Sequence, residues 1–162
     1  MTDVMRRRGE GNTEEFYAKA LARPWNGDDG YVEQATPAPF GYLLALDLYD
    51  CKDTTLCDVG RAYGFLEAVV AALGVNKQAP PYVVISPPEY IDKVGITGWV
   101  PLIESGIQIH TIQPRRYVSI VVHCCRKINE RAIRDIASSF FEPRDCVSQT
   151  ITCGKKYRWG DR

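Results

Sequence analysis

Apolar positions between residues 40 and 153 recur with two different periods, which predict strands and helices. Short apolar runs bounded by turn residues predict strands. These runs cover residues 42–49, 82–86, 98–103, 106–112, 117–125 and 146–152. Two longer segments, residues 55–73 and 128–141, repeat their apolar positions at three- or four-residue spacing, which predicts amphipathic helices. The predicted order is strand, helix, a series of strands, helix and strand.

The ends of the first predicted helix carry capping residues. Thr55 and Asp58 form a start that resembles a capping box, and Gly74 is suited to end the helix in a left-handed conformation. The element order is typical of the α+β class. We expect a two-layer sandwich, in which an antiparallel sheet carries both helices on one of its faces.

Residues 1–39 differ from the rest, because glycine, proline and charge are scattered through them. Thr13, followed by two glutamates, predicts one short helix over residues 13–22. The aromatic and aliphatic side chains of this arm would be costly to leave in water, so we expect it to dock on the domain or on a partner subunit. The predicted organisation is an arm over residues 1–39, a domain over 40–158 and a tail over 159–162.

Charge and hydropathy disfavour two classes of partner. The 162 residues contain 20 lysines and arginines and 20 aspartates and glutamates, so net charge gives no argument for nucleic acid or membrane. No apolar stretch approaches the ~20 residues that cross a bilayer. The arginines at positions 6–8 are not followed by the apolar segment of a secretory signal. We therefore expect a cytoplasmic protein.

The six cysteines include no CxxC pair, and the chain has only two histidines. This pattern disfavours a zinc site, and the lack of an export signal disfavours a disulfide framework. We expect no metal, and we expect most of the cysteines to be small buried side chains.

The candidate chemistry lies in residues 95–111, with the sequence GITGWVPLIESGIQIHT. This segment resembles the self-processing segment of bacterial and archaeal S-adenosylmethionine decarboxylases, in which a Gly-x-Ser/Thr-Gly turn, a strand ending in Glu-Ser and a short strand ending in His-Thr follow one another. The matching residues are Gly95, Thr97, Gly98, Glu104, Ser105, His110 and Thr111. The resemblance covers roughly residues 40–158, because residues 46–51 match the family's first strand and 117–125 match a strand that ends in a catalytic cysteine.

The resemblance implies a pyruvoyl-dependent decarboxylase of polyamine (spermidine) biosynthesis that cleaves its own chain at Glu104–Ser105. The Ser105 remnant becomes the pyruvoyl cofactor, whose carbonyl condenses with a substrate amine and withdraws electrons as carbon dioxide leaves. The resemblance places Thr97 and His110 in the processing step. It selects Cys125 rather than its neighbour as the residue that returns a proton to the substrate.

Strand alternation gives a second test of these assignments. Gln108 and His110 share one face of their predicted strand, and His123 and Cys125 share one face of theirs, while aliphatic residues take the opposite faces. The sheet should therefore have an aliphatic face for the helices and a polar face that carries His110 and Cys125. The polar face must be covered, so we expect a homo-oligomer that associates through it. Nothing in the sequence pairs His123 with chemistry, and it is interpreted as structural.

The chain departs from the family pattern around the substrate. Gly106 follows the cleavage serine, where the family usually has histidine. Ile112, Gln113 and Pro114 replace a Trp-Pro-Glu segment that stacks on adenine and holds ribose, and Ile91 stands where an aromatic residue is expected. We expect the nucleoside half of the substrate site to be changed.

Three interpretations of these departures remain open. The first is an S-adenosylmethionine decarboxylase with a rebuilt pocket. The second is a pyruvoyl decarboxylase for a smaller amino acid such as arginine or ornithine, whose carboxylate would meet Arg115 and Arg116. The third is an unprocessed, non-catalytic homologue that acts as a partner-binding subunit. Across these interpretations, the candidate substrate-binding residues are Gln108, Gln113 and Arg115.

Overall fold

Six strands and two long helices are formed by residues 39–87 and 89–157, which are the residues that this computed structural model describes. The strands are β1 Gly41–Tyr49, β2 Tyr82–Ile85, β3 Ile96–Leu102, β4 Ser105–Ile112, β5 Tyr117–Cys124 and β6 Asp145–Cys153. The helices are α2 Val59–Leu73 and α3 Glu130–Phe141, and the short 3-10 helices are η1 Asp53–Thr55, η2 Ile91–Lys93 and η3 Gln113–Arg115. Each strand and helix predicted between residues 40 and 153 is confirmed, with shifted ends. The helix predicted over residues 13–22 lies outside the described residues.

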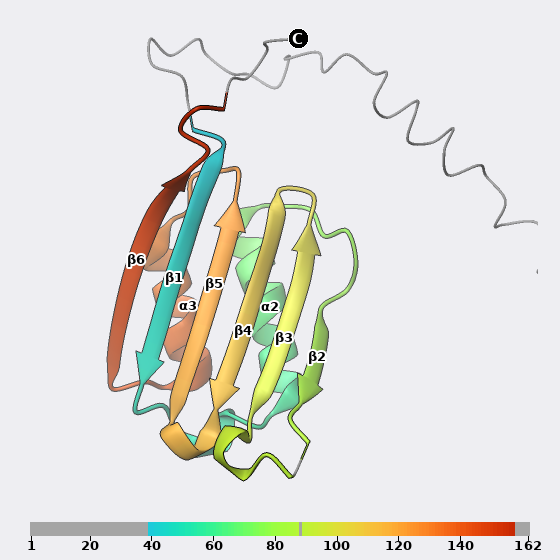
Figure 1. The fold of residues 1–162 in the computed structure, drawn as a ribbon, viewed down its shortest axis with the longest axis vertical. Helices are drawn as coiled ribbons and strands as arrows, with labels where there is room; N and C mark the ends of the chain where they lie inside the picture. Colours follow the sequence, from blue (N-terminus) through green and yellow to red (C-terminus); the bar gives the residue numbers. More distant parts are fainter. Residues whose placement is uncertain (1–38, 88, 158–162) are drawn as a thin grey trace, which may run out of the picture. The chain divides into compact units, whose positions relative to one another are not determined.

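All six strands belong to one antiparallel sheet with the order β2-β3-β4-β5-β1-β6. Helices α2 and α3 lie on the same face of this sheet, as Figure 1 shows. The α+β two-layer sandwich expected from the sequence is therefore confirmed. Within the described part of the chain, no helix is both long and apolar enough to cross a membrane.

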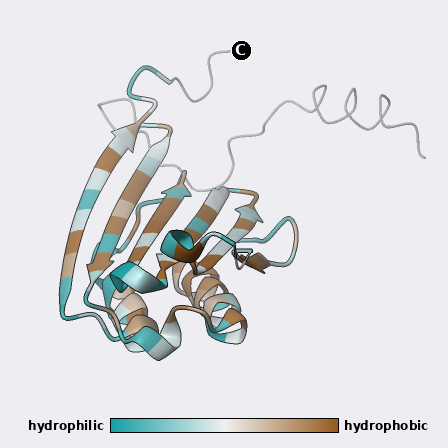
Figure 2. Ribbon diagram, turned by 60° about the horizontal axis from the view of Figure 1, so that its bottom comes forward, coloured by the Kyte–Doolittle hydropathy of each residue, from teal (hydrophilic) through white to brown (hydrophobic). Residues whose placement is uncertain are grey.

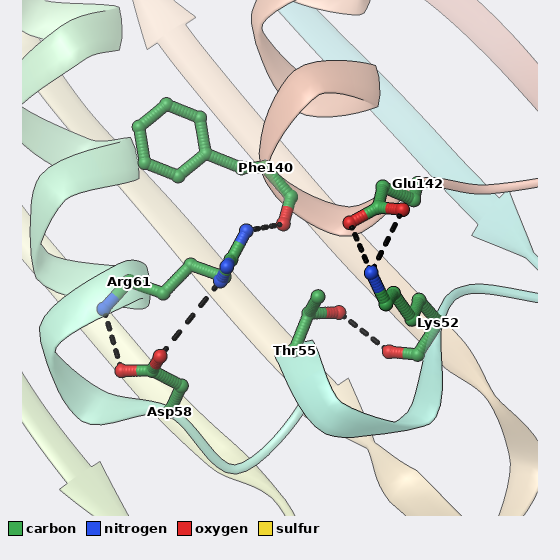
Figure 3. Close-up of polar contacts among 6 residues, drawn as sticks. All are labelled: Lys52, Thr55, Asp58, Arg61, Phe140 and Glu142. Carbon is green, nitrogen blue, oxygen red and sulfur yellow. Dashed lines mark hydrogen bonds and ion pairs between the residues drawn. The ribbon is translucent and has the colours of Figure 1, made fainter.

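Helix α2 begins later than the sequence pattern predicts. Its N-cap is Asp58, whose side chain accepts a hydrogen bond of 2.9 Å from the Arg61 backbone N–H (Figure 3). Thr55 instead belongs to η1, where its hydroxyl donates to the Lys52 carbonyl at 2.6 Å. The sequence pattern does not separate this turn from the helix, because Thr55 and Asp58 both satisfy the same capping pattern. The predicted end is confirmed, because Gly74 has φ 61°.

Alternation along the strands separates a buried from an uncovered face of the sheet. The helix-facing positions of the central strands are almost fully buried aliphatic residues. They include Leu44, Leu46, Leu48, Val100, Ile107, Ile109, Val118, Ile120 and Val122. The neighbouring positions point to the other face, and Figure 2 shows the change of hydropathy from residue to residue along each strand. The burial of one face against α2 and α3 leaves the opposite face open.

The two helices are held together at one end by an aromatic cluster and by polar contacts. Phe65 packs edge-on against Phe140 and Phe141, with ring centroids 5.8 and 5.2 Å apart. The Arg61 guanidinium donates to the Phe140 carbonyl at 2.9 Å, and Lys52 pairs with Glu142 at 3.1 Å (Figure 3). These contacts lie on the covered side, so the open face remains free to carry a site.

Candidate active site

A row of polar side chains crosses the open face of the sheet. Strand register places Thr97 opposite His110, His110 opposite Ser119, and Ser119 opposite Asp47. The hydroxyl of Thr97 lies 2.9 Å from Nδ1 of His110. Tyr117 donates from its hydroxyl to Asp47 at 2.5 Å, and burial together with this bond raises the pKa of the phenol. The face that alternation predicts as polar therefore carries these polar side chains, with one hydrogen-bonded pair at Thr97–His110 and another at Tyr117–Asp47.

The predicted cleavage point lies in the hairpin between β3 and β4. Leu102 pairs with Ser105, so Ile103 and Glu104 form the turn between the two strands. Such short turns usually place positive φ angles on the turn residues themselves. Here the positive φ falls on Ser105, at 146°. A residue other than glycine in this region stores on the order of 1–3 kcal/mol of strain.

The strained backbone brings the Ser105 hydroxyl to an unexpected partner. Strict alternation would point Ser105 to the helix side, together with Ile107. Instead its Oγ lies 2.6 Å from Nδ1 of His123, a residue of the open face of β5. His123, which its sequence context indicates as structural, lies against the predicted nucleophile. The only sequence signal was that His123 shares a strand face with Cys125.

The carbonyl group of the predicted scissile bond also has a defined partner. The backbone N–H of Cys125 donates to the Glu104 carbonyl at 3.1 Å. The Glu104 side chain is 9% exposed, accepts a bond of 3.0 Å from the Asn76 backbone and lies 3.9 Å from Arg126. These contacts hold the Glu104–Ser105 peptide between the ends of β4 and β5.

The backbone of Cys125 contacts the same peptide, and its thiol stays protonated at neutral pH. Burial raises the pKa of this thiol, and the Glu104 carboxylate raises it further. A thiol in this state can donate a proton, which is the role that the resemblance implies for it. The adjacent Cys124 instead points into the core, where burial likewise raises its pKa.

The structure does not bring the predicted processing residues together within one chain. His110 lies five residues beyond Ser105 on β4, which corresponds to about 16 Å along an extended strand. The structure therefore forms two separate pairs, Thr97 with His110 and Ser105 with His123.

The residues expected to contact substrate are spread along β4 and beyond it. Gln108 is exposed on the open face, opposite Trp99. Gln113 donates to Asp53 at 3.1 Å and accepts from the Cys57 thiol at 3.5 Å, and Arg115 lies exposed in the same short helix η3. Since η3 follows the far end of β4, neither Gln113 nor Arg115 lies near Ser105 of the same chain.

The residues present fit a pyruvoyl group made from Ser105. The peptide to be rearranged has the Ser105 hydroxyl as a nucleophile and the Cys125 N–H as a donor to its carbonyl oxygen. The serine is held in a strained conformation, and the thiol of Cys125 is protonated. Among residues 39–87 and 89–157, no group of three or more His, Cys, Asp or Glu side chains is placed to hold a metal ion.

The chain combines an antiparallel sheet, helices on one face of that sheet and a Glu-Ser hairpin at its open face. Comparison with known proteins identifies the class of protein that has this arrangement. The sequence model described as S-adenosylmethionine decarboxylase matches residues 42–154. The chain belongs to the S-adenosylmethionine decarboxylase family. The crystal structure of the adenosylmethionine decarboxylase from Aquifex aeolicus VF5 matches with a TM-score of 0.62 and 22% identity, over 72% of this chain and 92% of that one. At this identity the match shows a shared fold. A comparison with curated protein sequences found no match.

Proposed function

We propose that this protein cleaves its own chain between Glu104 and Ser105 and acts as a pyruvoyl-dependent decarboxylase in polyamine biosynthesis. One observation carries the proposal. The Glu104 carbonyl accepts a hydrogen bond from the Cys125 N–H at the point where strained Ser105 follows it in the chain. A donor aimed at that oxygen stabilises the charge that develops when a nucleophile adds to the carbonyl.

Self-cleavage would begin with the Ser105 hydroxyl. Its Oγ adds to the Glu104 carbonyl carbon, the peptide C–N bond breaks, and the amide nitrogen takes up a proton, so that an ester replaces the amide. Removal of the Ser105 Cα proton then breaks the Cβ–O bond and releases Glu104 as a carboxylate. The dehydroalanine left at the new terminus tautomerises, takes up water and loses ammonia.

The pyruvoyl group formed in this way would supply the carbonyl that binds a substrate amine and accepts electrons during loss of carbon dioxide. Cys125 would return a proton to the substrate carbon. The raised pKa of its thiol supports this role, because the group holds its proton at neutral pH. Its position next to the Glu104–Ser105 peptide supports it as well.

We also propose that two copies associate through the open face of the sheet. That face exposes apolar side chains on two strands, β3 and β6, with Trp99 50%, Val147 54% and Ile151 46% exposed. A processing role for His110 itself requires association, because His110 lies about 16 Å from Ser105 along its own strand. Sedimentation of the wild type against a Val147→Lys/Ile151→Lys variant tests this. We expect a dimer that dissociates in the variant, and a monomeric wild type at micromolar concentration would refute it.

Two candidate substrates follow from the family resemblance and from the positions that depart from it. The family resemblance favours S-adenosylmethionine. The positions that would stack on adenine and hold ribose are Ile112 and Pro114, which cannot stack and have no carboxylate, respectively. This observation favours a second candidate, a smaller amino acid such as arginine or ornithine.

Intact mass of the purified protein tests the proposal. Cleavage at Glu104–Ser105 would divide the 162 residues into fragments of 104 and 58 residues, and the second would carry the pyruvoyl terminus. Ser105→Ala is the matched control and should stay whole. Carbon dioxide release from S-adenosylmethionine, arginine and ornithine would then identify the substrate. A wild-type chain that stays whole on long incubation would instead support the non-catalytic, partner-binding homologue, for which residues 1–39 are the candidate docking segment.

A further inference from the structure

We propose that His123 is the base that takes the proton from the Ser105 hydroxyl during self-cleavage. The inference rests on the proposed function, and it names the residue that starts its first step. The distance between Oγ of Ser105 and Nδ1 of His123 is 2.6 Å, within the 2.6–3.2 Å range expected for a serine and its general base.

The other nitrogen of the ring distinguishes this histidine from a structural one. In the described part of the chain, Nε2 of His123 is buried and has no hydrogen-bond partner. A buried polar atom without a partner lowers stability by about 1–3 kcal/mol, and a structural histidine normally satisfies both nitrogens. The tautomer with its proton on Nε2 leaves the lone pair of Nδ1 directed at the serine hydroxyl.

The surroundings of the ring leave Ser105 as its polar partner. Strand register places His123 between Gly106 on β4 and Leu43 on β1. The Phe40 ring lies 6.2 Å from the imidazole, centroid to centroid. Neither Gly106 nor Leu43 has a side-chain group that would compete for Nδ1.

The end of β5 would therefore supply two functions from residues two positions apart. His123 would accept the Ser105 proton through its side chain, and Cys125 would stabilise the developing oxyanion through its backbone N–H. As the C–O bond forms, the proton moves from Oγ to Nδ1. As the C–N bond breaks, the same proton passes from Nδ1 to the Ser105 nitrogen, so that His123 ends in its starting state.

His110 of the same chain cannot perform this step. It lies about 16 Å from Ser105 along β4, and its Nδ1 is 2.9 Å from the Thr97 hydroxyl. If His110 acts in processing, it acts from another copy and at a different proton, because Nδ1 of His123 already contacts Oγ of Ser105.

Two substitutions separate a base from a positioning residue. His123→Asn places an amide oxygen near the position of Nδ1, so it can accept the serine hydrogen bond but cannot take the proton. His123→Phe fills the ring volume and provides neither. We expect both full-length variants to cleave at least about 100-fold more slowly than the wild type, since general-base catalysis contributes about 10²–10⁴-fold. His123→Ala should be slow as well, and added imidazole should accelerate it.

Circular dichroism and thermal melting would show that each variant is folded before cleavage is timed by intact mass. If the wild type and His123→Asn cleave at the same rate, the inference is overturned and the proposed function stands. A folded wild type that never cleaves would overturn both. If His123→Asn and His123→Phe do not fold, the inference is decided by imidazole rescue of His123→Ala: acceleration supports it, and a rate independent of imidazole contradicts it.

Discussion

The indole nitrogen of Trp99 lies 3.2 Å from the position that a β-carbon on residue 106 would occupy. Gly106 and Trp99 are diagonal neighbours on β4 and β3, since Gly106 pairs with Pro101 and Trp99 with Gln108. The absence of a side chain at 106 therefore provides the space into which the half-exposed indole extends. The loss of the family's usual histidine at this position and the presence of Trp99 are two parts of one packing arrangement beside the cleavage site.

Restoring histidine at position 106 should therefore disturb this packing. We expect Gly106→His to lower the free energy of unfolding by about 1–3 kcal/mol, because the new side chain must displace the indole. When Trp99→Val is already present, Gly106→His should lower the free energy of unfolding by less, since valine leaves the space open. Urea unfolding of the wild type, both single variants and the double variant measures this coupling. Additive losses would show that the two positions do not share the space.

The strain at Ser105 can be tested apart from its chemistry. Ser105→Gly and Ser105→Ala both remove the hydroxyl, but glycine adopts a φ of 146° without a side-chain clash. We expect the glycine variant to be more stable than the alanine variant by about 1 kcal/mol, or roughly 3 °C in Tm, and neither to cleave. Equal melting temperatures would argue that the hairpin relaxes and stores no strain.

Thr111, on the helix-facing side of β4, is predicted to stabilise the fold through its hydroxyl. Its buried hydroxyl donates to the Leu56 carbonyl at 2.6 Å and accepts from the Ile96 N–H at 2.7 Å. Thr111→Val would leave both backbone groups without partners, and we expect a loss of about 2–4 kcal/mol in unfolding free energy. Thr97→Val is the matched control, because the half-buried hydroxyl of Thr97 contacts a side chain, His110, and no backbone carbonyl or N–H depends on it in the described part of the chain. A loss no larger than that of the control would contradict the structural role of Thr111.

Stability should fall at high pH because of Cys51. This residue is 0% exposed, and burial raises the pKa of its thiol from about 9 to about 11. Above pH 9 the unfolded chain loses this proton while the folded chain keeps it, so the unfolded state gains relative stability. The free energy of unfolding should therefore fall as pH rises from about 9 to 11, by on the order of 2 kcal/mol in total.

Urea unfolding of the wild type and of Cys51→Ala between pH 8 and 11 measures this effect. The pKa values of the Cys57, Cys124 and Cys125 thiols and of the Tyr117 phenol are raised as well, so the informative quantity is the difference between the two pH profiles. Alanine lowers stability at every pH by removing core volume, but it should flatten the alkaline fall. Parallel profiles would contradict the assignment to Cys51.

Much of the fold and part of the site follow from local pattern. Alternation and helical spacing predict the six strands and the two long helices of the described residues, because the burial of one face imposes its period on each element by itself. The same alternation predicts that His110 and His123 lie on the open face. The start of α2 was predicted too early, at Thr55 rather than after Asp58, because two adjacent residues can both cap and only the path of the chain selects one.

The tertiary structure alone decides which polar residues meet. The register of β4 against β5 places His123 beside the Glu-Ser hairpin, and the φ of Ser105 turns the hydroxyl toward it. The same geometry keeps His110 about 16 Å away from the serine in its own chain. The period of apolar positions along a strand determines which face a side chain takes. It carries no information on the register between strands or on the strained φ angle of Ser105. Those two quantities depend on contacts between distant segments, and they define the candidate active site.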